Sequence, residues 1–141
     1  MRKLMVLICL LVSVSGFSLA QDEAQSGYEI ALERIAEAER TGTADLNLGG
    51  LQLTELPPEI GNLINLQWLT LYHNQLTHLP PEIGSLTNLQ RLNLWQNQLS
   101  SLPPQIGQLI NMEALDLGDN QLDTLPHEVW QLTQLQELNL N

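Results

Sequence analysis

Leucines alternate with polar residues in short runs along most of this chain, and from Thr43 onward the pattern returns every 23 residues. Each run contains Leu-x-Leu, then usually an asparagine, and typically ends in Leu-Pro-x-x-Ile-Gly-x-Leu. The residues that keep this spacing include Asn74, Asn97 and Asn120, and Pro57, Pro80, Pro103 and Pro126. Alternation of period two predicts a short strand with one buried face. A repeat of this length predicts a stack of similar units instead of one globular core.

The repeat divides residues 43–141 into four full units, 43–65, 66–88, 89–111 and 112–134, and a partial fifth, 135–141. One unit cannot bury its hydrophobic face alone, so neighbouring units must pack on each other and pair strand to strand. The asparagine follows the strand, where its amide can both donate to and accept from the backbone of neighbouring turns. The prolines break strand pairing, and the glycine is expected to ease a tight bend as the chain returns.

A helix is predicted ahead of the repeats, within residues 21–42. Ser26 and Glu29 have the spacing of a capping box, and Gly42 supplies a stop. Its expected apolar stripe is formed by Tyr28, Leu32, Ile35 and Ala36. We expect this helix to cover the open end of the stack, as solenoids require. The alternative is a docking helix for a separate partner.

Residues 1–20 resemble a secretory signal peptide. Arg2 and Lys3 precede an apolar run over residues 4–14, and the segment ends in Ser-Leu-Ala at residues 18–20. An uncleaved membrane anchor is the alternative, but the run is shorter than the ~20 residues that a membrane span needs. The segment therefore predicts cleavage after Ala20, a secreted or periplasmic protein, and no membrane insertion afterwards.

Cysteine and charge refine this picture. The one cysteine, Cys9, lies in the leader, so the exported chain must be held together without disulfides, which favours a bacterial protein. The leader also holds two of the five basic residues, which leaves three arginines against sixteen acidic residues, a net charge of −13. Such a surface disfavours nucleic acid and anionic lipid as partners. The acidity either attracts a basic partner or only keeps the protein in solution.

The pattern Leu-x-x-Leu-x-Leu-x-x-Asn-x-Leu-x-x-Leu-Pro-x-x-Ile-Gly-x-Leu over residues 43–141 resembles the leucine-rich repeat family. It is similar to the 23-residue subclass found in Ras-suppressor-type proteins and in many bacterial proteins. The resemblance implies an α/β solenoid, a horseshoe with short parallel strands on its concave face, here with an N-terminal capping helix. It also implies that the concave face binds other proteins.

The sequence departs from the family pattern in two of its units. Leu51 takes the asparagine position in the first unit, which fits a terminal turn. Trp130 takes the position of the glycine seen at Gly61, Gly84 and Gly107. Because the neighbours of Trp130 are core positions, its side chain is predicted to be a packed filler and not a ligand contact.

The residues between the inward leucines should form columns across the strands. Three aromatic residues fall on this face, with Trp68 expected beside Arg91 and Tyr72 expected beside Trp95. Tryptophan, tyrosine and arginine dominate the energetics of protein interfaces. The alternative is that these side chains only pack against each other. The candidate partner-binding residues are Trp68, Tyr72, His73, Arg91, Trp95, Asp116 and Asp119.

These observations predict a non-catalytic, exported module that binds a protein partner through its concave strand face. Envelope glycan binding and a truncated fragment of a larger repeat protein are the alternatives. Neither a catalytic site nor a cofactor is predicted, because His73, His78 and His127 fall at different repeat positions and no nucleophile or phosphate-loop motif is present. Residues 135–141 would leave leucines and a strand edge uncovered, which makes end-to-end self-association possible.

Overall fold

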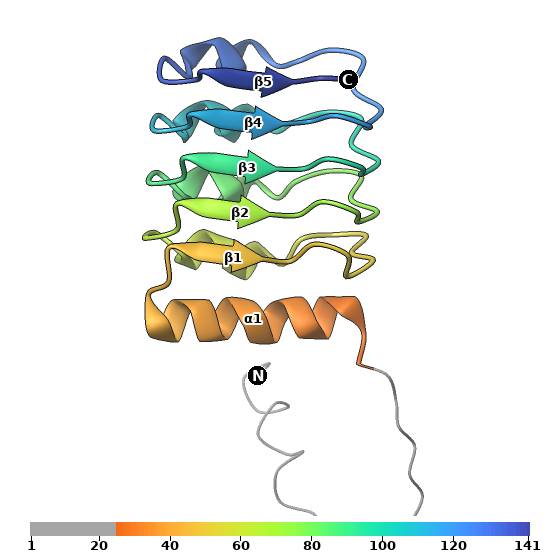
Figure 1. Ribbon diagram of the computed structural model, residues 1–141, viewed down its shortest axis with the longest axis vertical. Coiled ribbons are helices and arrows are strands. Elements are labelled where there is room, and N and C mark those ends of the chain that lie inside the picture. Colours follow the sequence, from red (N-terminus) through yellow and green to blue (C-terminus); the bar gives the residue numbers. More distant parts are fainter. Residues whose placement is uncertain (1–24) are drawn as a thin grey trace, which may run out of the picture.

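The computed structural model describes residues 25–141, and the leader predicted at 1–20 lies outside the described residues. The described chain begins with helix α1 (Gly27–Thr41) and continues into a stack of turns (Figure 1). Its strands are β1 (Asp45–Asn47), β2 (Trp68–Thr70), β3 (Arg91–Asn93), β4 (Ala114–Asp116) and β5 (Glu137–Asn139). They form one parallel sheet in sequence order, which confirms the predicted solenoid.

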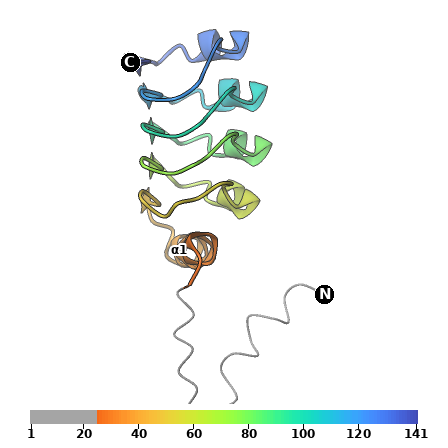
Figure 2. The same ribbon diagram turned by 90° about the vertical axis from the view of Figure 1, so that its right-hand side faces the viewer.

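A second layer lies behind the sheet (Figure 2). It consists of the 3-10 helices η1 (Pro58–Asn62), η2 (Pro81–Ser85), η3 (Pro104–Gln108) and η4 (His127–Gln131). Each follows the proline at which strand pairing was predicted to break, and in the first three a second proline occupies the first helical position. Strands therefore line one side of the stack and 3-10 helices line the other.

Side chains alternate in and out along the strands as the pattern predicted. The central leucine of the first four strands is buried, whereas the residues flanking it are exposed or half-buried. The pairing register joins residues 23 apart, for example Trp68 with Arg91 and Arg91 with Ala114. The predicted columns across the sheet are therefore present.

The asparagines after the strands make the backbone contacts expected of them. The side chain of Asn97 is 7 % exposed; its Oδ1 accepts the N–H of Leu76 at 3.1 Å, and its Nδ2 donates to the carbonyls of Leu71 and Leu94, both at 3.0 Å. Asn74 and Asn120 repeat this arrangement. Each amide thus satisfies buried backbone groups that strand pairing leaves unmet.

A second series of asparagines joins neighbouring units on the return side, and it was not predicted. Asn88 Nδ2 donates to the carbonyl of Ile64, and Asn111 Nδ2 donates to the carbonyl of Thr87, both at 2.8 Å. The spacing of 23 between Asn65, Asn88 and Asn111 in the sequence was the signal that could have found it.

Helix α1 lies across the β1 end of the stack, as predicted (Figure 1). The capping box is present, with the Glu29 N–H donating to Ser26 Oγ at 3.2 Å, and Gly42 ends the helix in the left-handed conformation. The predicted stripe was partly wrong, because Ala36 is exposed. The buried positions are Ala31, Ile35 and Ala38, since the spacing of three to four residues from Ile35 keeps them on one face.

The glycines of the 3-10 helices have a different role from the tight bend expected of them. A Cβ added at Gly107 would lie 2.8 Å from the Cβ of Glu128 and 2.9 Å from its carbonyl oxygen, and Gly61 and Gly84 meet the next unit in the same way. The glycine therefore allows consecutive 3-10 helices to approach closely.

The prediction for Trp130 was wrong. The residue holds the glycine position in η4, the last 3-10 helix of the described chain, and it is 71 % exposed. Val129 in the same 3-10 helix is buried, whereas the side chain of Trp130 lies in solvent. Trp130 is therefore not a packed filler.

Candidate binding surface

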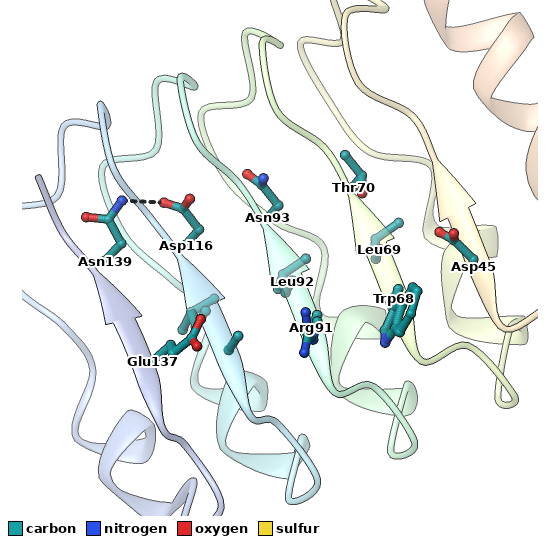
Figure 3. A pocket seen from close by; sticks show the side chains of 12 residues that line it. Asp45, Trp68, Leu69, Thr70, Arg91, Leu92, Asn93, Asp116, Glu137 and Asn139 are labelled. Carbon is teal, nitrogen blue, oxygen red and sulfur yellow. Dashed lines mark hydrogen bonds between the residues drawn. The ribbon is translucent and has the colours of Figure 1, made fainter.

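The candidate site is the strand face, which we define as the outward side of β1 to β5 together with the turn that follows each strand. A hollow of about 350 Å³ lies over the sheet and includes residues of all five strands. Figure 3 shows its lining, in which aromatic and basic side chains stand over β2 and β3 and acidic side chains stand over β1, β4 and β5.

Trp68 and Arg91 are neighbours on this face, as the register predicted. The Cζ atom of Arg91 lies 5.6 Å from the centroid of the Trp68 ring, and the two side chains stand together over β2 and β3 (Figure 3). Trp68 is 48 % exposed and Arg91 is exposed as well. Their contact is a cation–π interaction, which leaves the outer side of both groups accessible.

The other two rings meet through a histidine. The Tyr72 and His73 ring centroids are 5.3 Å apart at 75°, and those of His73 and Trp95 are 5.0 Å apart at 86°. Both are edge-to-face contacts, a geometry that favours aromatic pairs. The expectation that Tyr72 lies beside Trp95 is therefore right for the backbone positions, whereas His73 makes the ring contacts between them.

Two glycines make room for the outer rings. A Cβ added at Gly49 would lie 2.8 Å from Cε1 of Tyr72, and one added at Gly118 would lie 3.0 Å from Cδ1 of Trp95. Tyr72 therefore leans over the first unit and Trp95 leans over the fourth. Trp95 is half-buried as a result, and its contacts with the scaffold fix the orientation of its ring.

The backbone holds His73 in place. Its φ is 53°, and Gln96 and Asp119 at the equivalent positions have φ values of 52° and 51°. Residues other than glycine seldom adopt this left-handed conformation, which costs on the order of 1 kcal/mol. The His73 N–H donates to the carbonyl of Trp95 at 3.0 Å, so strand-to-strand bonding maintains the turn and presents the imidazole outward.

The two predicted acidic residues take part in the scaffold as well as in the surface. Asp116 Oδ1 accepts the Gly118 N–H and the Asn139 amide, both at 3.0 Å. Asp119 Oδ2 accepts the Gln96 amide at 3.3 Å. Sequence reasoning missed two further carboxylates that line the hollow, Asp45 and Glu137, although both belong to the same column of side chains as Trp68 and Arg91.

Other kinds of site receive no support from the described chain. Within residues 25–141, no group of three or more histidine, cysteine, aspartate or glutamate side chains is placed to hold a metal ion. The only α-helix among these residues, α1, is too short and too polar to span a bilayer.

The predicted self-association of residues 135–141 is untested and stays a prediction. β5 is the last strand in the sheet order. Leu140 is 54 % exposed there, and Leu135 and Leu138 are half-buried.

Comparisons with known proteins agree with this geometry. A family model described as leucine rich repeat matches residues 87–141, and a second, described as leucine rich repeats in two copies, matches residues 64–105. The chain belongs to the leucine-rich repeat family. Proteins of this family are generally non-enzymatic modules that bind other proteins. No curated protein matches the sequence.

Solved structures show the same fold. A leucine-rich repeat protein of Leptospira interrogans is 53 % identical over 68 % of this chain, with a TM-score of 0.68. The leucine-rich repeat domain of a Shigella effector is 29 % identical over 74 % of the chain (TM-score 0.61), and YopM from Yersinia enterocolitica is 27 % identical over 86 % (TM-score 0.64). The match spans only 24 %, 44 % and 25 % of those three structures, respectively.

Proposed function

We propose that this protein is an exported, non-catalytic interaction module that binds a protein partner through its strand face. The anchors are Trp68, Arg91, Tyr72 and Trp95, and the rim is formed by His73, Asp116 and Asp119. Membership of the leucine-rich repeat family supports protein binding in general. The leader-like sequence at residues 1–20 and the bacterial sources of the similar structures support export from a bacterial cell.

One observation supports the choice of surface above the others. Three aromatic residues and an arginine lie on one face within two adjacent units, and their contacts leave a large part of them accessible to solvent. Scattered exposed apolar residues are common on protein surfaces, whereas aromatic residues gathered on one face more often mark an interaction site.

The contacts among these residues favour binding over simple self-packing. Trp68 remains 48 % exposed although Arg91 stacks on it, so an apolar group of a partner would still remove indole surface from water. Trp95 and His73 are held by ring contacts and backbone hydrogen bonds. A surface whose side chains are already ordered loses less entropy when it binds.

The test is affinity capture from the envelope fraction of the native host, with the wild-type protein and two variants as bait. Trp68→Ala removes an anchor of the strand face. Trp130→Ala is the matched control, because it removes an exposed tryptophan of the return side. We expect a partner that Trp68→Ala loses and Trp130→Ala retains.

Two other results would contradict the proposal. Equal capture by all three baits would show that the strand face does not bind the captured protein. Enrichment of a saccharide on a glycan array, lost with Trp68→Ala and without any captured protein, would assign the same rings to glycan binding.

A further inference from the structure

The charges on the strand face are unevenly placed. The column of side chains nearest the strand starts reads Asp45, Trp68, Arg91, Ala114 and Glu137 from β1 to β5. One cation stands at its centre and a carboxylate stands at each end. All five residues line the hollow over the sheet, together with Asp116.

The guanidinium of Arg91 is held toward the β2 side of this column. The guanidinium of Arg91 stacks on Trp68, which belongs to β2, and forms no ion pair with any residue of the described chain. A guanidinium stacked in this way keeps its forked N–H donors at its edge, where they match the two oxygens of a carboxylate. Arg91 is therefore suited to receive an acidic side chain from outside.

The acidic side of the hollow is suited to a basic group instead. Ala114 carries only a methyl group, and the carboxylates of Asp116 and Glu137 lie on the same face around it. Glu137 makes no side-chain hydrogen bond or ion pair within residues 25–141, and both hydrogen bonds of Asp116 go to Oδ1. Both carboxylates line the same hollow, so a cation placed over Ala114 would gain attraction from each of them.

We propose that the strand face binds an extended partner segment that carries an acidic and a basic side chain two residues apart. The acidic side chain meets Arg91 beside Trp68, and the basic side chain enters the hollow over Ala114 to meet Asp116 and Glu137. The inference rests on the proposed function, because it assumes a protein partner on this face, and it adds the chemistry of the segment that is recognised.

The spacing fits such a segment. Arg91 and Glu137 are two strands apart in the sheet, which corresponds to about 10 Å at ~4.8 Å per strand. Side chains two residues apart in an extended peptide leave the same side about 7 Å apart. Glutamate, lysine and arginine side chains are long enough to spread over the remaining difference. The strongly negative net charge of the protein also favours approach of the basic group.

The experiment titrates short capped peptides into the protein and follows its backbone amide signals by NMR. Four peptides share one length and one aromatic residue and differ in a pair of positions two residues apart, which are Glu/Lys, Glu/Glu, Lys/Lys or Ala/Ala. We expect the Glu/Lys peptide to shift signals of β3, β4 and β5 and to bind about tenfold more tightly than each of the others.

Charge-reversal variants should change the preference in a defined way. With Glu137→Lys the Glu/Glu peptide should become the tightest, and with Arg91→Glu the Lys/Lys peptide should. Glu59→Lys is the control, because Glu59 is an exposed carboxylate of η1 on the return side, and it should leave the order unchanged.

Equal affinities for the four peptides, shifts outside the strand face, or no shifts at millimolar peptide would overturn the charge pairing. So would a Glu59→Lys variant that changes the order as Glu137→Lys does. These results are separable from failure of the proposed function. A partner that is captured through Trp68 without any charge preference would leave protein binding intact and remove only this inference.

Discussion

The third and fourth units follow the same 23-residue plan, yet they place their tryptophans on opposite sides of the stack. Trp95 lies on the strand face, where it leans over Gly118 and contacts His73. Trp130 lies on the return side, in the position where the third unit has the closely approached Gly107. The half-buried ring of Trp95 is oriented by its neighbours, whereas the ring of Trp130 is 71 % exposed.

Gly107 and Trp130 hold equivalent positions in the third and fourth units. The residue at this position is therefore constrained by what packs against it and not by the repeat pattern alone. Gly107 is required because the backbone of η4 lies against it. A family pattern therefore predicts most interior leucines, and the asparagines of the second to fourth units, well. It predicts less well the residue type at a contact between units, because that type depends on which atoms lie against it.

The largest effect is expected when the asparagines of these two units, Asn97 and Asn120, are replaced. Asn97→Ala would leave the buried Leu76 N–H without an acceptor, at about 1–3 kcal/mol, and would remove two hydrogen bonds, at about 1 kcal/mol each, from the carbonyls of Leu71 and Leu94, which keep the amides of Asn74 and Asn120. We expect a loss of about 3–5 kcal/mol in the free energy of unfolding, measured by urea denaturation. Asn120→Ala should cost about half as much, because Asn120 is half-exposed and water can replace its amide. Equal losses would show that burial does not set the cost.

The next largest effect is expected for a substitution that makes the third unit resemble the fourth. Gly107→Trp would force a side chain against the Cβ and the carbonyl oxygen of Glu128, so η3 and η4 could no longer pack as they do. We expect a loss of at least about 3 kcal/mol in the free energy of unfolding, at the upper end of overpacked sites. Unchanged stability in thermal or urea unfolding would refute the close-approach role of this glycine.

A smaller effect is expected when the tryptophan ring of the third unit is removed from the strand face. Trp95→Ala should weaken partner binding by about 2 kcal/mol or more, as truncation of an interface anchor does. It should lower the free energy of unfolding by only about 1 kcal/mol, because the ring is already half-exposed. Calorimetric titration with the captured partner and urea unfolding give the two values. Similar losses in both would mean that the ring is structural.

The smallest effect is expected where the fourth unit is made to resemble the third. Trp130→Gly removes an exposed side chain from a position whose backbone already suits glycine in three other units. We expect a change within about 1 kcal/mol in the free energy of unfolding, and unchanged partner affinity. A loss as large as that of Gly107→Trp would show that Trp130 packs against the stack after all.

Much of the architecture could be predicted from the sequence. The 23-residue spacing predicted the columns of residues 23 apart, the inward leucines and the amide bonds of Asn74, Asn97 and Asn120, because each of these depends on contacts that repeat from unit to unit. The parallel direction of the strands was implied by the family resemblance. The cap at Ser26 and Glu29 could be predicted for another reason, since it depends on residues three apart in the chain.

The parts that could not be predicted depend on the directions of individual side chains. The register places Tyr72 beside Trp95, but only the space over Gly49 and Gly118 shows that the rings lean apart and meet through His73. The exposure of Trp130 depends on what lies next to η4. The 23-residue spacing puts Glu137 in one column with Arg91, whereas its place in the lining of a hollow beside Ala114 needed the structure.

The most direct test of recognition through the strand face is hydroxyl-radical footprinting of the three tryptophans in the free protein and in its complex with the captured partner. The proposal predicts that oxidation of Trp68 and Trp95 falls in the complex while oxidation of Trp130 stays at its free level. Protection of Trp130 with Trp68 and Trp95 still reactive would contradict it and place the interface on the return side.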